Sequence, residues 1–264
     1  SGETSSGAEA GENAEPELTE EEKKAEAEVD AYFDNAVFVG DSIMLGFRNY
    51  AMKRQDTFLS RPQFLAAGSF SVNNALWPVD DKSVHPVYRG EQHQIWESIA
   101  MMGSKRVFLM LGMNDLNING VEGTCKKYEE LVDNIKETDP DAEIHIMSMT
   151  YILHGKEVGM LQNDIIRQYN QELEKLAEEM ELPVNARLIR RVKKTKRQKE
   201  LGPAERRKNL EGAFALAKPG QMKYCRILLV DDIYTTGSTV DAIASLLKVN
   251  GAEQVDFVCA AIVK

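Results

Sequence analysis

The sequence repeats one pattern that strongly constrains its fold: a short run of apolar, β-favouring residues ends at a turn, and a helix-like segment follows. The runs are residues 37–39, 63–67, 106–111, 143–149, 226–230 and 254–262. Strands that alternate with helices and are apolar on both faces form parallel sheets covered by helices. We therefore predict an α/β protein, a three-layer αβα sandwich around a mainly parallel, flavodoxin-like sheet.

The segments between these runs have helical periodicity. The predicted helices cover about residues 43–52, 91–102, 123–136, 161–181 and 239–249. The fourth is long and amphipathic, and one face carries Ile165, Tyr169, Leu173, Leu176 and Met180. A further helix should precede the first strand and end near residue 33, because Thr19 and Glu22 have the spacing of a capping box.

The chain divides into three parts. Residues 1–18 are rich in Gly, Ser, Ala and Glu without an apolar period, which predicts a disordered acidic tail. Residues 19–181 hold the first four strands, and residues 182–264 hold the last two. Four strands alone would leave a face and an edge open, so we predict that the strands of residues 182–264 complete a single merged sheet, with two independent domains as the alternative.

Charge and composition exclude several classes of function. The net charge of −10 argues against a general nucleic-acid or membrane-surface binder. No apolar run approaches the ~20 residues that cross a bilayer. Cys125, Cys225 and Cys259 show no C-x-x-C spacing, so neither a metal site nor a disulfide framework is predicted.

Three short motifs each close a predicted strand. They are Gly40-Asp41-Ser42, Gly68 and Gly112-Met113-Asn114-Asp115. Sites in open parallel sheets form at the carboxyl ends of the strands, so these motifs should meet there. Taken singly, each is also consistent with a turn glycine or a helix cap. In this order, they resemble the SGNH (GDSL-type) hydrolase family over about residues 36–180.

That resemblance implies a serine esterase acting on an ester or O-acetyl group, with no cofactor. Ser42 would be the nucleophile, and the Ser42 N–H, the Gly68 N–H and the Asn114 amide would stabilise the oxyanion. Asp41 and Asp115 would order the loops.

The family's Asp-x-x-His block, which supplies the general base, has no counterpart in this chain, and no histidine follows His154. The candidate substitute bases are His154 and His85, both on predicted loops, whereas His145 lies inside a strand and suits a packed position. A serine without its base is a poor nucleophile. The expected esterase is therefore impaired.

A second motif lies at residues 227–239, where four apolar residues, two acids and a Thr/Gly/Ser-rich loop precede a helix. It resembles the phosphoribosyl-diphosphate motif of type I phosphoribosyltransferases, closest to the ComF-like branch. Loop N–H groups can hold a 5'-phosphate at a helix amino terminus, and the acids can accept ribose hydroxyls. The implied binding residues are Asp231, Asp232, Thr235, Thr236, Gly237, Ser238 and Thr239, with Mg²⁺ accompanying a phosphoribosyl diphosphate ligand.

The basic run at residues 187–208 has three interpretations. In order of preference they are a solvated or disordered loop, a loop that closes over a phosphate ligand, and a nucleic-acid patch. The last is disfavoured because no aromatic residues are interleaved.

The chain thus resembles a hybrid, with the changeover in the helix at about residues 164–180. The alternatives to the impaired esterase are phosphoribosyl-phosphate binding by the ComF-like part and a catalytically silent scaffold. The expected partners are a small ester or sugar phosphate, with no membrane span and no nucleic acid. The first part resembles an exported domain and the second a cytoplasmic one.

Overall fold

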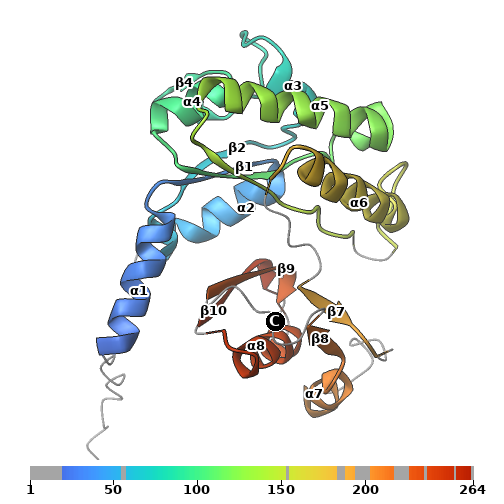
Figure 1. The fold of residues 1–264 in the computed structure, drawn as a ribbon. Helices are drawn as coiled ribbons and strands as arrows, with labels where there is room; N and C mark the ends of the chain where they lie inside the picture. Colours follow the sequence, from blue (N-terminus) through green and yellow to red (C-terminus); the bar gives the residue numbers. More distant parts are fainter. Residues whose placement is uncertain are drawn as a thin grey trace, which may run out of the picture.

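A four-stranded parallel sheet forms the centre of the first part of the chain (Figure 1). The computed structural model describes residues 20–54, 58–152, 155–182, 188–193, 203–216, 226–234, 237–252 and 254–262. The sheet has the order β2-β1-β5-β6. Its strands are β1 (Ala36–Gly40), β2 (Gln63–Ala66), β5 (Arg106–Met110) and β6 (Glu143–Ile146). The predicted α/β class with a parallel sheet is confirmed.

The register of the sheet builds a row of aromatic rings across all four strands. Phe38 pairs with Phe64 on one side and Phe108 on the other, and Phe108 pairs with His145. Successive ring centroids lie 5.7, 4.6 and 4.6 Å apart. His145 is therefore a packed face residue, as predicted, because parallel pairing in register places aligned side chains on the same face.

Helices cover both faces of this sheet and make three layers. On one face, α2 (Ser42–Ala51) inserts Phe47 edge-on against Phe38 and Phe64, with 5.2 Å between centroids in each pair. On the other lie α3 (Val72–Leu76), α4 (Ile95–Met102) and α5 (Leu116–Thr138), and α6 (Asn163–Glu179) packs against α5 (Figure 1). The helix α1 (Glu20–Phe33) adds Phe33 to the aromatic cluster, and η1 (Phe58–Ser60) precedes β2.

Two helices begin at other residues than predicted. The helix expected from residue 91 begins at Ile95, because Gln94 and Glu97 form a capping box there. Just before it, β3 (Val87–Tyr88) and β4 (Glu91–Gln92) pair as a hairpin. The helix expected from residue 123 begins at Leu116 and is kinked at Gly120, where φ is 64°. The buried face of α6 is close to the prediction, with Ile166 and Ala177 in place of Ile165 and Met180.

The second part forms smaller sheets. Parallel strands β9 (Arg226–Tyr234) and β10 (Gln254–Ile262) flank α8 (Ser238–Val249) in sequence. Antiparallel strands β7 (Ile189–Arg191) and β8 (Phe214–Leu216) form a separate pair, and α7 (Pro203–Leu210) lies between them in sequence. The basic run predicted as a loop thus contributes β7 and part of α7, and its residues 194–202 lie outside the described residues, as do residues 1–18.

The strands of the two parts do not share a ladder in the described ranges. β9 and β10 pair with each other, whereas the first sheet contains only β2, β1, β5 and β6. Their buried apolar residues also form separate clusters, and the smaller one contains Leu216, Leu247 and Ala252. The physical reason is that β10 lies against α2 and not along a free sheet edge. The merged sheet that we expected is not seen in this part of the chain.

Candidate functional site

The sheet register brings the three predicted hydrolase motifs to one edge. Gly40 at the end of β1 pairs with Ala66 of β2 and with Met110 of β5. Ser42 lies two residues beyond Gly40, Gly68 two beyond Ala66, and Asn114 four beyond Met110. All three therefore follow the carboxyl ends of adjacent strands, where open parallel sheets form their sites.

Ser42 is exposed and is the first residue of α2. The buried Asp41 caps this helix, and its Oδ1 accepts a hydrogen bond of 2.8 Å from the Ile43 N–H. Burial raises the Asp41 pKa, and backbone N–H donors partly offset this. Only glycine fits at residue 40, since a Cβ there would lie 2.6 Å from the Met44 Cβ and 2.8 Å from the Met110 carbonyl oxygen.

Gly68 is presented by a turn that contacts both neighbouring motifs. The Phe70 N–H donates to the Ala67 carbonyl (3.3 Å), and the Ala67 N–H donates to the Gly40 carbonyl (3.3 Å). Ser69, the third residue of this turn, has φ of 58°, a left-handed conformation that is uncommon outside glycine. The turn thus joins the end of β2 to the end of β1, the strand that precedes Ser42.

Asn114 is tied to the same turn. Its Nδ2 donates to the Phe70 carbonyl oxygen at 2.9 Å. An amide nitrogen carries two hydrogens, so one of them can serve a substrate oxygen. Gly112, the first residue of this motif, has φ of 119°, and a Cβ there would overlap the Tyr169 hydroxyl.

Asp115 is fully buried and connects the β5 motif to α3. It accepts hydrogen bonds from the Val72 and Asn73 N–H groups, both at 2.9 Å, and from Asn73 Nδ2 at 2.8 Å. Burial raises the Asp115 pKa, whereas the backbone donors lower it. Asn73 and Ser71, which caps α3, were not singled out from the sequence. The serine at a helix start is the signal that could have found Ser71, whereas no local pattern marks Asn73.

The two candidate substitute bases have different outcomes. His154 lies outside the described residues. His85 is buried against Phe70, with 5.8 Å between ring centroids, and neither ring nitrogen has a hydrogen-bond partner among the described residues. Burial lowers the His85 pKa, so the ring is neutral near pH 7. A neutral imidazole can accept a proton, but a general base must also come within hydrogen-bond reach of the hydroxyl.

The predicted phosphoribosyl motif is described in part. Asp231 and Asp232 lie on β9, which continues past the predicted end at residue 230. The side chains of these two residues, and the whole of Thr235 and Thr236, lie outside the described part of the chain. Gly237 caps α8 with φ of 71°, and its carbonyl accepts from the Asp241 N–H at 2.8 Å. Ser238 is buried and Thr239 half-buried at the start of this helix.

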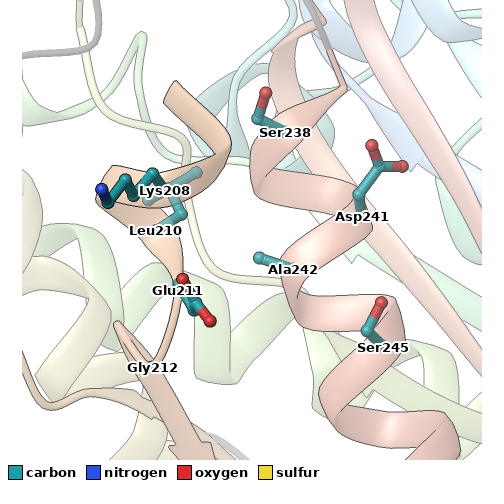
Figure 2. Close-up of a pocket in the computed structure, with 8 residues that line it drawn as sticks. All are labelled: Lys208, Leu210, Glu211, Gly212, Ser238, Asp241, Ala242 and Ser245. Carbon is teal, nitrogen blue, oxygen red and sulfur yellow. The ribbon is translucent and has the colours of Figure 1, made fainter. Parts of the chain in front are cut away.

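An open pocket of about 660 Å³ lies beside this helix (Figure 2). One wall is the end of α7 and the following turn, and the other is a face of α8. Figure 2 shows Glu211 on the first wall and Ser238, Asp241, Ala242 and Ser245 on the second. Lys208, Leu210 and Gly212 complete the lining. Apart from Ser238, none of these residues was predicted from the sequence to bind a ligand, because their neighbourhood arises from packing between α7 and α8.

The described residues contain no group of three or more His, Cys, Asp or Glu side chains that could hold a metal ion. Cys125 is a free thiol, and burial raises its pKa to about 11. None of the described helices is both long and apolar enough to span a membrane.

Two family models match the chain. The GDSL-like lipase/acylhydrolase family matches residues 38–197, and the phosphoribosyl transferase domain matches residues 173–262. The two matches overlap over residues 173–197, which include the second half of α6. The predicted resemblance to both families in one chain is confirmed.

Curated relatives match the second part. Competence protein F of Haemophilus influenzae is 39% identical over 93 residues, which is 34% of this chain and 41% of that protein. The DNA utilization protein YhgH of Escherichia coli O157:H7 is 45% identical over 71 residues, 27% of this chain and 30% of that protein. The chain thus spans between about a third and two fifths of these relatives' length.

Several solved structures resemble part of the chain at low sequence identity. A putative platelet activating factor from Streptococcus pneumonia has 17% identity and a TM-score of 0.39, covering 60% of this chain and 72% of that one. A putative acylhydrolase from Bacteroides fragilis has 13% identity and a TM-score of 0.41, covering 63% and 77%. An acetyl xylan esterase has 15% identity and a TM-score of 0.40, covering 56% and 74%.

Proposed function

Because the chain belongs to the GDSL-like lipase/acylhydrolase family, whose model matches more than half of its residues, we propose that it is a carboxylic ester hydrolase with Ser42 as nucleophile. The observation that supports this most is the turn at residues 67–70. It contacts the β1 motif through the Gly40 carbonyl and the β5 motif through Asn114 Nδ2. Three motifs that are distant in the sequence are thereby held close together.

In the proposed reaction, the Ser42 Oγ attacks the acyl carbonyl carbon and the carbonyl oxygen becomes an oxyanion. The Ser42 and Gly68 N–H groups and the Asn114 amide donate to that oxyanion, and preorganised donors of this kind contribute about 3 kcal/mol each. The Ser42 proton must pass to a base and then to the leaving alcohol. We propose that the missing Asp-x-x-His block makes this step slow, so the enzyme is impaired.

Labelling of Ser42 by a fluorophosphonate tests the proposal, because phosphorus bonds to the Ser42 oxygen, fluoride leaves, and the adduct is seen by intact mass. We expect a slow adduct that Ser42→Ala abolishes. Asn114→Ala should lower its rate by about 10²–10³-fold through loss of one oxyanion donor. Asn134→Ala is the matched control, since Asn134 lies near the far end of α5 and takes no proposed part in the reaction. No Ser42 adduct would refute the proposal.

A second candidate function is supported by the phosphoribosyl transferase match over residues 173–262. We propose that the start of α8 binds a phosphoribosyl phosphate, with the 5'-phosphate at the N–H groups of residues 237–239. Gly237, in its left-handed conformation, leaves these groups at the amino end of the helix, where the helix dipole favours an anion. Asp231 and Asp232 would accept the ribose hydroxyls.

Calorimetry tests this second function with ribose-5-phosphate and with phosphoribosyl diphosphate, the latter with and without Mg²⁺. We expect binding that Gly237→Val abolishes, since a β-branched residue does not tolerate φ of 71°. Asp231→Ala should weaken it. Gly251→Ala, another positive-φ glycine in the same part, separates loss of binding from general strain. Identical flat titrations would refute this function, and flat titrations without a Ser42 adduct would favour a silent scaffold.

A further inference from the structure

Three exposed apolar residues lie on two segments that leave the same sheet edge as Ser42. Ile118 is 74% exposed, Val158 70% and Met160 39%. Ile118 follows β5, and the other two follow β6. Isolated exposed apolar residues are ordinary on protein surfaces, but a group that the backbone holds together indicates a binding surface. We call these three residues the apolar rim.

Ile118 lies beside the proposed oxyanion donor Asn114. The chain makes a helical turn from Gly112, in which the Asp115 and Leu116 N–H groups donate to the Gly112 carbonyl at 2.9 and 3.1 Å. The Ile118 N–H continues it by donating to the Asp115 carbonyl at 2.9 Å. Ile118 therefore lies in the first turn of α5, which directly follows the motif that contains Asn114.

Asn117 brings the second segment to this turn. Its Oδ1 accepts a hydrogen bond of 2.8 Å from the Met160 N–H. Gly159, with φ of 60°, approaches so closely that a Cβ there would lie 2.7 Å from that same oxygen. Val158 and Met160 flank this contact, and the Leu161 N–H closes the turn on the Val158 carbonyl at 3.0 Å.

The second segment is also fixed to α6, so the rim is held in place. The side chain of Asn163 accepts from the Ile152 N–H at 2.7 Å and donates to the Ile152 carbonyl at 2.9 Å. Residues 116–121 and 158–162 contain no charged residue, although 28% of the chain is charged. The two anchored segments that carry the rim are themselves uncharged, which suits an apolar ligand group.

We propose that the apolar rim binds the acyl chain of the substrate, an ester of a straight-chain acid of six or more carbons and not an acetyl ester. This rests on the proposed function, because it places the acyl carbonyl at Ser42 and Asn114. The chain then extends over Ile118 to Val158 and Met160. Covering these side chains removes apolar surface from water on both partners.

The test measures rates of Ser42 labelling by alkyl fluorophosphonates with chains of one to ten carbons. We expect the second-order rate constant to rise about two- to fourfold per methylene until the rim is covered. Ile118→Asn and Val158→Asn should flatten this dependence and leave the rate with the methyl probe unchanged. Val249→Asn, an 87% exposed valine at the end of α8, is the matched control. Rates independent of chain length, or equal slopes in all variants, would overturn the proposal.

A second measurement keeps the test independent of Ser42 chemistry. Two protein variants are titrated by calorimetry, Ser42→Ala and the double variant Ser42→Ala with Ile118→Asn. The ligands are acetate and decanoate, the latter below its critical micelle concentration. We expect Ser42→Ala to bind decanoate more tightly than acetate, and the added Ile118→Asn to remove the difference. If no probe labels Ser42, the hydrolase proposal fails and this titration decides the rim alone. Equal binding of the two acids would overturn it.

Discussion

Among the glycines that the structure describes, Gly112 leaves the least room for a side chain. Its φ of 119° disfavours any side chain, and a Cβ would meet the Tyr169 ring as well as its hydroxyl. We expect Gly112→Ala to lower the free energy of unfolding by about 2–4 kcal/mol, through combined backbone strain and overpacking. Urea denaturation measures this change.

Gly46 is the matched control for Gly112. It lies inside α2, and a Cβ there would have no heavy atom within 4 Å. Gly46→Ala should therefore stabilise the protein by about 0.5–1 kcal/mol, because alanine has the higher helix propensity. Equal effects of the two substitutions would show that the close packing of Gly112 on Tyr169 does not prevent a side chain at residue 112.

His85 determines part of the pH dependence of stability. Burial lowers its pKa from 6.5 in the folded protein, so the unfolded chain binds the proton more readily. The contribution of neutral His85 to the free energy of unfolding is therefore fully present above about pH 6.5. It is lost as the pH falls below that value. Burial lowers the His145 pKa as well, so that residue adds to the same trend.

The urea concentration at the unfolding midpoint should thus decrease when the pH is lowered from 7 to 5. His85→Leu should make this decrease smaller. The comparison uses the slope with pH, so a change in stability at pH 7 caused by the substitution does not affect it. An unchanged slope in His85→Leu would show that His85 is not buried in the neutral form.

At the scale of elements, α6 fixes the segment that leaves β6. The Asn170 side chain accepts from the Met149 N–H at 2.7 Å and donates to the Met149 carbonyl at 2.9 Å, while the Tyr169 hydroxyl donates to the Leu111 carbonyl at 3.1 Å. Hydrogen bonds of this kind contribute about 1 kcal/mol each. The helix thus holds backbone from two different strand ends.

We expect Asn170→Ala to increase hydrogen exchange at the Met149 amide and to destabilise the protein by about 1–2 kcal/mol. Asn170→Asp is the conservative comparison, since a carboxylate still accepts from the Met149 N–H but cannot donate to its carbonyl. The Met149 amide should therefore stay more protected in Asn170→Asp than in Asn170→Ala. Equal protection in both would contradict the role of this bond.

At the scale of the whole molecule, the two separate clusters of buried residues predict two units of stability. Leu131 is fully buried in the larger cluster and Leu247 in the smaller. Either residue changed to alanine should cost about 2–5 kcal/mol in its own unit. We expect Leu247→Ala to increase hydrogen exchange in α8 only, and Leu131→Ala to increase it in α5 and the four-stranded sheet. Spread of either effect over both units would indicate one cooperative core.

The fold was predictable from the sequence only in part. The four strands of the first sheet were predictable because each is a short apolar run that ends at a turn. The α5 start at Leu116 and the β3–β4 hairpin were not, because both depend on local hydrogen bonds between residues without apolar periodicity. The merged sheet was expected because an open sheet edge is unfavourable. No local sequence pattern predicts the packing of β10 against α2.

For the candidate site, the sequence by itself determined the residue types and their order along the chain, with Gly40, Gly68 and Gly112 marking the strand ends. Local patterns suffice there, since turns and strand ends are set by neighbouring residues. Only the tertiary structure decided which groups meet: the Ala67 N–H on the Gly40 carbonyl, and Asn114 on the Phe70 carbonyl. It also brought Asn117 to Met160, because contacts between distant segments depend on strand register and helix packing, which local sequence does not encode.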